Sequence, residues 1–278
     1  MGLVGYPRSP IGRARPPVVA PASQGPTYDP DAVAAFARMT PDPPAAQKKR
    51  VSDFIIAWKA SGKWATDDAL WLHASHSSQA ALVNLKGNAA YDCVPVNGPT
   101  FRQYGGYFPD GSTSYLSTGF NPATATTPNF VRDNGSLWIR SNTDNSATGS
   151  LAGMFNSNGT TINPRNGGSA NYRVNCTGAV SLAVTTAVGM FVANRTGASA
   201  TQLYQDGVSL GTGTQASLAP INGMFRLGAI SDTSLRACEF SAGGIGAGMA
   251  DATQAAACAA ALNAYLNALR TEEGVTIA

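Results

Sequence analysis

The sequence predicts a mostly β protein built as a two-sheet antiparallel sandwich. Short β-rich segments recur at nearly regular spacing, and clusters of Gly, Asn, Asp and Pro separate them. Only 13% of the 278 residues are charged, which is low for a helical enzyme or a coiled coil. Between two β-rich runs lies Asp206-Gly207, a dipeptide that favours the type I′ turn of a β-hairpin. An isolated hairpin is marginal in water, so we expect this one in the middle of a large sheet.

Residues 1–45 predict an extended arm rather than part of the core. Ten of the seventeen prolines lie here, and such a segment favours extended conformations, apart from one short helix within 31–39. Residues 1–50 hold seven Lys or Arg against three Asp, whereas the rest of the chain is nearly neutral and offers no basic face for nucleic acid. The arm is therefore expected to anchor the protein to a partner, with these residues in contact: Arg8, Arg13, Arg15, Pro16 and Pro17.

Residues 46–87 predict a helical and linker segment that packs on the sandwich. Val51, Phe54, Ile55 and Trp58 form one apolar stripe at helical spacing, and Gly62 is suited to end that helix. A short strand at 70–72 and a short helix within 79–85 are expected to follow.

Residues 88–278 predict the sandwich and a closing helix. The strands are expected at 114–116, 135–140, 151–155, 172–176, 180–184, 190–194, 203–205, 208–210, 224–230 and 237–243. The segment from Asp251 to Gln254 has the pattern of a capping box. The buried stripe of the helix that follows is expected to be Cys258, Leu262, Tyr265, Leu266 and Leu269.

Three stretches in order resemble a domain common in virion proteins of tailed phages and prophages. They are Trp64-Ala-Thr-Asp-Asp-Ala-Leu-Trp-Leu with Gln79-Ala-Ala-Leu-Val-Asn-Leu-Lys, Gly106-Tyr-Phe-Pro-Asp-Gly-Ser-Thr-Ser-Tyr-Leu-Ser-Thr-Gly-Phe-Asn-Pro, and Leu203-Tyr-Gln-Asp-Gly with the closing helix. This domain is similar to the concanavalin A-like (laminin G-like) jelly-roll sandwich. The resemblance implies a structural protein of the virion, made in the host cytoplasm, such as a capsid decoration protein, head spike or tail fibre component.

The resemblance also implies partners. Residues 1–45 would bind other virion proteins of the capsid, the portal region or the tail, and a homo-oligomer stays open. The alternative is a carbohydrate-binding module that reads host surface glycans. The longest expected polar loop, 156–171, holds residue types that contact sugars, although the same types also form plain turns. The candidate glycan-binding residues are Asn156, Asn158, Arg165, Asn171 and Tyr172.

Catalysis, a metal and a cofactor are not expected. A glycoside hydrolase usually needs two facing carboxylates, and the only glutamates are Glu239, which lies in an expected strand, and Glu272 and Glu273, which we place after the last helix. Asp67 and Asp68 are adjacent, so their side chains diverge on a strand. For His73 and His76 we favour surface or helix-capping positions over a metal site.

The remaining motifs also favour structural roles. Residues 243–248 are rich in glycine but lack the spacing of a nucleotide-binding loop, so we interpret them as a turn. The four cysteines are widely spaced, which favours buried free thiols, although a Cys238–Cys258 bridge stays open. No apolar run is long enough to predict a membrane span.

Overall fold

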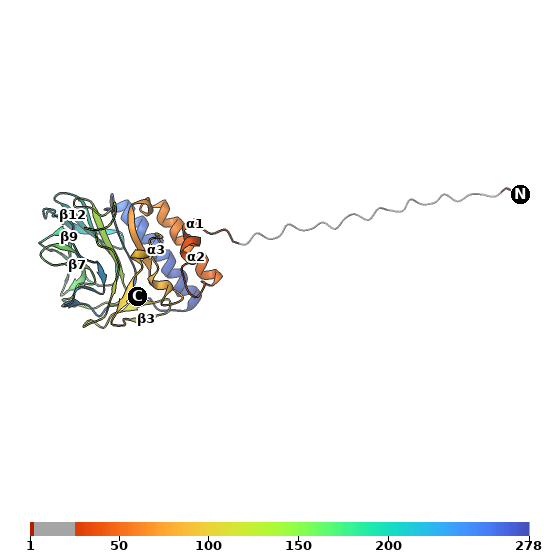
Figure 1. Ribbon diagram of the computed structural model, residues 1–278, viewed down its shortest axis with the longest axis horizontal. Coiled ribbons are helices and arrows are strands. Elements are labelled where there is room, and N and C mark those ends of the chain that lie inside the picture. Colours follow the sequence, from red (N-terminus) through yellow and green to blue (C-terminus); the bar gives the residue numbers. More distant parts are fainter. Residues whose placement is uncertain (3–25, 278) are drawn as a thin grey trace.

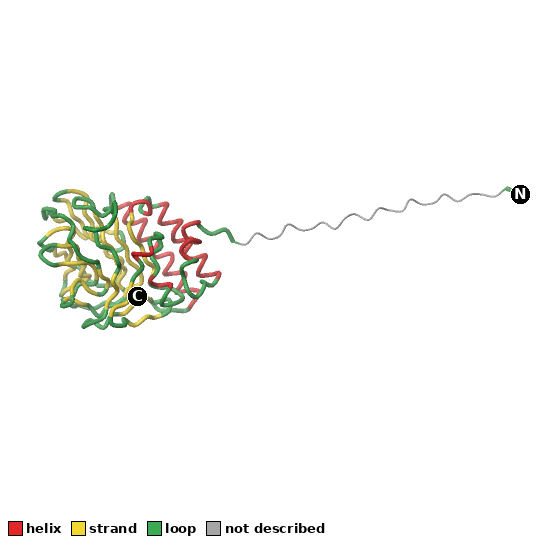
Figure 2. The backbone as a smooth tube through the Cα atoms, viewed as in Figure 1, coloured by secondary structure: helices red, strands yellow, loops and turns green. Residues whose placement is uncertain are grey.

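Two antiparallel sheets face each other, and three helices cover the outer side of one of them (Figure 1). The computed structural model describes residues 1, 2 and 26–277. The helices are α1 (Pro30–Phe36), α2 (Ala45–Ala60) and α3 (Ala252–Glu273), with 3₁₀ turns η1 (Trp64–Thr66), η2 (Ala80–Leu82) and η3 (Ala89–Tyr91). Figure 2 shows the separation of helices from strands. The predicted sandwich is thus confirmed.

Each sheet mixes strands from distant parts of the chain. The eight-stranded sheet runs in the order β13 (Val208–Gly213), β12 (Ala200–Gln205), β11 (Gly189–Gly197), β6 (Gly135–Ser141), β17 (Phe240–Gly246), β4 (Gly106–Phe108) and β3 (Thr100–Arg102), with β1 (Asp67–Leu72) also paired to β17. The seven-stranded sheet runs β10 (Val180–Ala183), β9 (Ser169–Cys176), β8 (Gly159–Asn166), β7 (Ala152–Phe155), β14 (Arg226–Leu227), β5 (Tyr115–Ser117) and β2 (Val94–Val96). A small ribbon joins β15 (Ala229–Ser231) to β16 (Ser234–Leu235).

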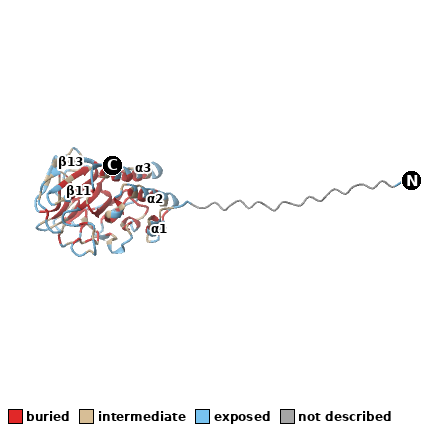
Figure 3. Ribbon diagram, turned by 90° about the horizontal axis from the view of Figure 1, so that it is seen from above, coloured by how far each residue is buried: buried red, intermediate tan, exposed pale blue. Residues whose placement is uncertain are grey.

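The eight-stranded sheet is buried on both faces. On β6, Leu137 and Ile139 point into the core between the sheets, whereas Trp138 points toward the helices. All seven residues of β6 and of β17 are buried, as Figure 3 shows for the centre of the molecule. Two hydrophobic layers therefore share this sheet, and no helix among the described residues covers the outer side of the seven-stranded sheet.

The two long helices match the predicted stripes. Val51, Phe54, Ile55 and Trp58 are buried on α2, and the five predicted stripe residues are buried on α3. At the start of α3, Gln254 N–H donates to Asp251 Oδ1 at 2.8 Å, which confirms the cap. These contacts hold α2 and α3 against each other and against the sheet.

The hairpin turn is confirmed, but its place in the sheet was predicted wrongly. Asp206 and Gly207 have φ of 49° and 81°, as a type I′ turn requires. A Cβ on Gly207 would lie 2.4 Å from Ala256 Cα, so only glycine lets the turn approach α3 so closely. However, β13 is the edge strand of its sheet and not the middle. Strand β6 provides the neighbour on the other side of β11.

The extended arm predicted for residues 1–45 is too long, because its last part contains α1, which packs in the core. Ala32, Ala35, Phe36 and Met39 are buried in the layer between helices and sheet, so the chain joins the core well before residue 45. The segment 46–87 likewise contributes β1 to the eight-stranded sheet instead of only packing on it. The predicted arm contacts lie outside the described residues: Arg8, Arg13, Arg15, Pro16 and Pro17.

The expected polar loop at 156–171 was wrong, because most of it forms the β8–β9 hairpin. Ile162 contributes to the core, and the polar residues Thr160, Thr161 and Asn163 are also buried. Asn163 is polar, so the sequence around it does not indicate a buried strand. In the fold its side chain is buried because other parts of the chain provide its hydrogen bonds. Pro164 falls where the β8–β9 register is irregular, a place where a strand tolerates proline.

The glycine-rich segment 243–248 was also interpreted wrongly as a turn. Gly243 to Gly246 belong to β17, which pairs with β6 and β1. A Cβ on Gly244 would lie 2.4 Å from Trp138 Nε1, and one on Gly246 would lie 2.4 Å from the Thr66 carbonyl oxygen. The glycines therefore make room for a tryptophan and for neighbouring backbone.

Candidate functional site

The outer face of the seven-stranded sheet carries a row of polar side chains. Register places Arg173 opposite Thr161, Thr161 opposite Gly153, and Gly153 opposite Arg226. Directly opposite residues of antiparallel strands share a face, so both arginines lie on one surface about 14 Å apart, three strand spacings. Each guanidinium lies over an aromatic ring: Arg173 over Phe155 at 4.6 Å and Arg226 over Tyr115 at 4.5 Å. No helix within residues 26–277 covers this face.

A polar depression of about 300 Å³, the Asn171 hollow, lies at the β8–β9 end of this face. It is lined by Thr148, Ser150, Thr161, Asn163, Asn166, Asn171, Arg173 and Ala179. Its wall at 148 and 150 belongs to the segment before β7, which pairs with β8 through Leu151 N–H and Ile162 O at 2.7 Å. No carboxylate is among the residues that line the hollow.

Buried Arg236 fixes one wall of the Asn171 hollow. Its guanidinium has six oxygen acceptors at 2.7–3.0 Å, all of them carbonyl or amide oxygens. They include Asn163 Oδ1 and the carbonyl oxygens of Ala147 and Gly149. Asn163 Nδ2 in turn donates to the carbonyl oxygens of Ala147 and Thr148. The side chain of Asn163 therefore forms its hydrogen bonds within the protein, and these bonds hold the wall of the hollow in place.

Four other polar side chains that line the hollow make no hydrogen bonds to other described residues. Among the described residues, no side-chain hydrogen bond involves Thr148, Ser150, Asn166 or Asn171. Hydroxyl and amide groups can both donate and accept, as the hydroxyls of a sugar do. The hollow therefore offers a set of unused, uncharged hydrogen-bonding groups together with one guanidinium.

The structure brings only one of the five predicted glycan-binding residues into the hollow, which is Asn171. Asn156 and Asn158 form the β7–β8 turn at the other end of β8, and Asn158 lies five residues, about 17 Å, along the strand from Asn163, the residue opposite Asn171. Arg165 is paired with Asp144 at 3.0 Å. Tyr172 is fully buried between the sheets, so its ring is not available to stack on a sugar. Arg173 and Asn166 were missed, although both lie beside predicted positions.

The glutamates lie apart from the hollow. Glu239 is paired with Arg102 at 2.6 Å, and burial raises its pKa in spite of this arginine. Glu272 and Glu273, expected after the last helix, instead end α3 and pair with Arg50.

The adjacent aspartates diverge, as predicted for a strand. Asp67 is buried and accepts from Trp58 Nε1 at 2.7 Å and from Lys63. Asp68 instead accepts from the backbone N–H groups of Asn129 and Phe130, both at 2.8 Å. The two carboxylates therefore serve separate structural contacts.

Both histidines are buried, which corrects the predicted surface or capping positions. His73 Nδ1 lies 2.7 Å from the Ala81 carbonyl oxygen, and burial lowers the pKa of His73 to about 4. His76 Nε2 lies 2.9 Å from the Pro41 carbonyl oxygen, so it ties the N-terminal segment to the sandwich. Within residues 1, 2 and 26–277 no three His, Cys, Asp or Glu side chains gather as a metal site would require.

The four cysteines are buried free thiols, as predicted. Cys238 lies in the core between the sheets, whereas Cys258 lies in the layer under the helices. The eight-stranded sheet separates the two, so the open alternative of a Cys238–Cys258 bridge is ruled out. No helix in the described part of the chain is long and apolar enough to span a bilayer.

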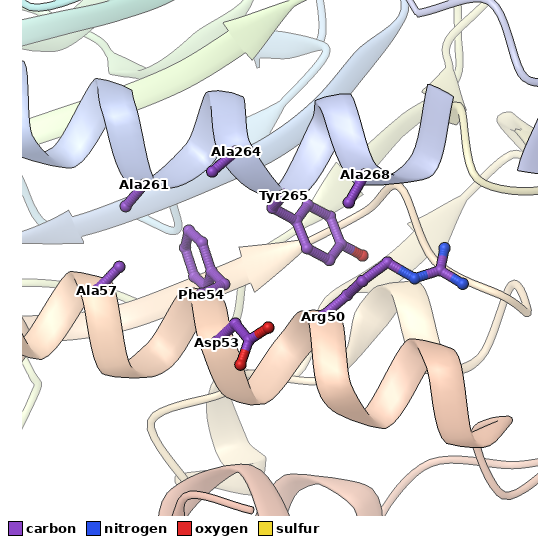
Figure 4. Close-up of a pocket in the computed structure, with 8 residues that line it drawn as sticks. All are labelled: Arg50, Asp53, Phe54, Ala57, Ala261, Ala264, Tyr265 and Ala268. Carbon is purple, nitrogen blue, oxygen red and sulfur yellow. The ribbon is translucent and has the colours of Figure 1, made fainter. Parts of the chain in front are cut away.

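A second, smaller depression of about 120 Å³ lies between α2 and α3 (Figure 4). Ala57, Ala261, Ala264 and Ala268 line it together with Phe54 and Tyr265, and Arg50 and Asp53 complete the lining. The small alanine side chains leave this gap where the helices meet. It lacks the set of unused hydrogen-bonding groups that the Asn171 hollow has, so we take the hollow as the candidate site.

No family model and no curated protein matches this chain. Solved structures do match. A sialidase of Trypanosoma rangeli is similar with a TM-score of 0.53 and 11% identity, over 78% of this chain and 39% of the sialidase. Another structure of that sialidase, in complex with sialic acid, has a TM-score of 0.51 and 10% identity, over 77% of this chain and 39% of the sialidase.

The botulinum neurotoxin serotype D binding domain is similar with a TM-score of 0.51 and 11% identity, over 72% of this chain and 51% of that structure. The chain thus spans two fifths to about half of these solved proteins. The shared fold is a two-sheet antiparallel β-sandwich. Identities this low show the fold alone, and function has to be argued from the site.

Proposed function

We propose that this protein is a carbohydrate-binding module and that its Asn171 hollow holds the sugar. The observation that carries the proposal is the set of unused hydroxyl and amide groups of Thr148, Ser150, Asn166 and Asn171 on an uncovered sheet. The wall that presents them is held by Arg236 and Asn163, so the site is formed before a ligand arrives. A preformed polar site suits a polyhydroxylated ligand.

The experiment is an oligosaccharide array with the purified protein, followed by calorimetry of the best ligand. Asn171→Ala removes one amide that has no hydrogen-bond partner among the described residues, so the fold should be unaffected. Loss of one ligand hydrogen bond of about 0.5–1.5 kcal/mol should weaken binding about two- to twelvefold. Asn156→Ala, at the opposite end of β8, is the matched control and should bind like the wild type. Absence of binding by the folded wild type to every saccharide would refute the proposal.

A second candidate is the structural virion role that the sequence resemblance implies. It is favoured by position: α1 and α2 lie on the side of the sandwich opposite the uncovered sheet (Figure 1). Attachment through the N-terminal segment would then leave the polar sheet facing outward. This role is compatible with glycan binding, because the two use opposite sides of the molecule.

The test of attachment is a truncation at residue 25 and not at 45. Removing residues 1–25 leaves α1 intact, whereas removing 1–45 would also delete Phe36 and Met39 from the core. The shorter truncation should fold as the full chain does and fail to co-purify with particles of a phage that encodes it. Normal incorporation of the truncated chain would contradict the anchoring role.

A further inference from the structure

We infer that the saccharide held in the Asn171 hollow is anionic and carries a carboxylate, which Arg173 binds. This inference rests on the proposed function and narrows it from sugars in general to acidic sugars. It follows from comparing the arginines that lie on or beneath the same sheet.

Arg173 lacks the acidic partner that two neighbouring arginines have. Arg165 pairs with Asp144 at 3.0 Å, and Arg226 pairs with Asp232 at 2.6 Å. Among the described residues, no carboxylate pairs with Arg173. Its Nε donates to the Thr177 carbonyl oxygen at 3.1 Å and its Nη1 to Thr161 Oγ1 at 3.4 Å.

The guanidinium of Arg173 has donors left for a ligand. A guanidinium carries five N–H donors, and the protein uses two of them here. The stacked ring of Phe155 and the bond to Thr177 fix the plane of the group. A fixed planar fork is suited to bind a carboxylate through two parallel hydrogen bonds.

A second cation without a carboxylate partner, Arg236, lies directly behind the lining residue Asn163. Arg236 is 1% exposed, and its hydrogen-bond acceptors are the carbonyl and amide oxygens already described, with no carboxylate among them. One of these acceptors, Asn163 Oδ1, belongs to a residue that lines the hollow. Burial lowers the pKa of both guanidiniums, and for neither does a nearby carboxylate contribute. Two positive charges therefore act on a cavity whose lining has no negative one, which favours an anion.

The test compares saccharides that differ in charge but not in shape. Oligogalacturonate and its methyl ester form one pair of probes, and sialyllactose and its carboxyl methyl ester form a second. The acidic member of a bound pair should bind about tenfold more tightly than the neutral one, and the difference should shrink as salt is raised. Arg173→Gln should lower the affinity for the acidic member about tenfold and abolish the difference within the pair.

Arg226→Gln is the matched control, because Arg226 lies in the same row over its own aromatic ring but is neutralised by Asp232. It should leave the preference for the acidic member unchanged. Asn171→Asp is a second variant, which keeps Arg173 in place and adds a carboxylate to the hollow. This variant should lose affinity for the acidic member of each pair and keep its affinity for the neutral member.

The possible failures can be told apart. Binding of neutral saccharides with equal or greater affinity, or an equal loss in the Arg173 and Arg226 variants, overturns the inference and leaves the proposed function standing. A folded protein that binds neither member of any pair, on these probes and on the array, overturns both.

Discussion

Replacing Gly244 by alanine tests whether the glycine-rich segment is a packing device. The new Cβ would lie 2.4 Å from Nε1, 2.6 Å from Cε2 and 2.8 Å from Cζ2 of Trp138. This ring is fully buried and packs against Trp58 with ring centroids 5.0 Å apart, so it has little room to move away. The methyl group must then displace the indole and, with it, α2.

The expected cost follows from overpacking in a buried layer. Forcing a methyl group into a filled core costs about 1–3 kcal/mol of unfolding free energy. At about 2–4 °C per kcal/mol for a domain of this size, the melting temperature should fall by about 2–12 °C. Guanidinium chloride unfolding followed by tryptophan fluorescence would give the free energy, and calorimetry would give the melting temperature.

The adjacent glycine provides the control. A Cβ on Gly243 would lie 3.4 Å from the Trp138 carbonyl oxygen and at least 3.5 Å from Leu227, which is ordinary contact. Gly243→Ala should therefore be neutral or slightly stabilising, since alanine restricts the unfolded chain. Equal stability of the two variants, or a larger loss for Gly243→Ala, would refute the packing argument.

Three further predictions concern titration and reactivity. The pKa of His73 is about 4 when folded and about 6.5 when unfolded, so stability should fall by up to about 3 kcal/mol as pH drops from 6.5 to 4, and His73→Gln should remove this part of the pH dependence in denaturation curves. Three backbone N–H groups and Thr113 lower the pKa of Asp110, so NMR should find its carboxylate ionised below pH 3, where a freely titrating carboxylate would contradict the contacts. A thiol reagent should react slowly with the native protein and release four thiols after denaturation; rapid labelling of the native protein would contradict the buried positions of Cys93, Cys176, Cys238 and Cys258.

The sequence was sufficient for the parts of the fold that depend on local signals. The α2 stripe at Val51, Phe54, Ile55 and Trp58 follows from helical periodicity, and the turn at Asp206-Gly207 follows from its tolerance of positive φ. The order of strands within the sheets follows from contacts between distant residues, which no local pattern records. This is why β13 was placed in the middle of the sheet when it is the edge.

The site was harder to predict because a strand with buried polar residues has the same sequence pattern as a polar loop. β8 contains Thr160, Thr161 and Asn163, which are polar in the sequence yet buried in the fold. Only the partners supplied by other segments, Arg236 above all, make Asn163 acceptable inside the sheet. Tyr172 was expected to be exposed but is buried. Side chains alternate between the two faces along β9, so the ring of Tyr172 lies in the core and Arg173 lies on the outer face. Recognising 159–176 as two strands would have moved the prediction from Tyr172 to Arg173.

The cost of burying Arg236 connects the stability of the sandwich to the proposed use of its open face. Removing a guanidinium from water is expensive, and here its hydrogen bonds to carbonyl and amide oxygens compensate for the lost hydration without cancelling its charge. A carboxylate at the same place would have cancelled the charge as well, as Asp232 does for Arg226. The same set of contacts therefore fixes the wall of the Asn171 hollow and leaves that hollow electropositive. Because the helices stabilise the other sheet from the opposite side, the Asn171 hollow can open to solvent without weakening the layer that holds the molecule together.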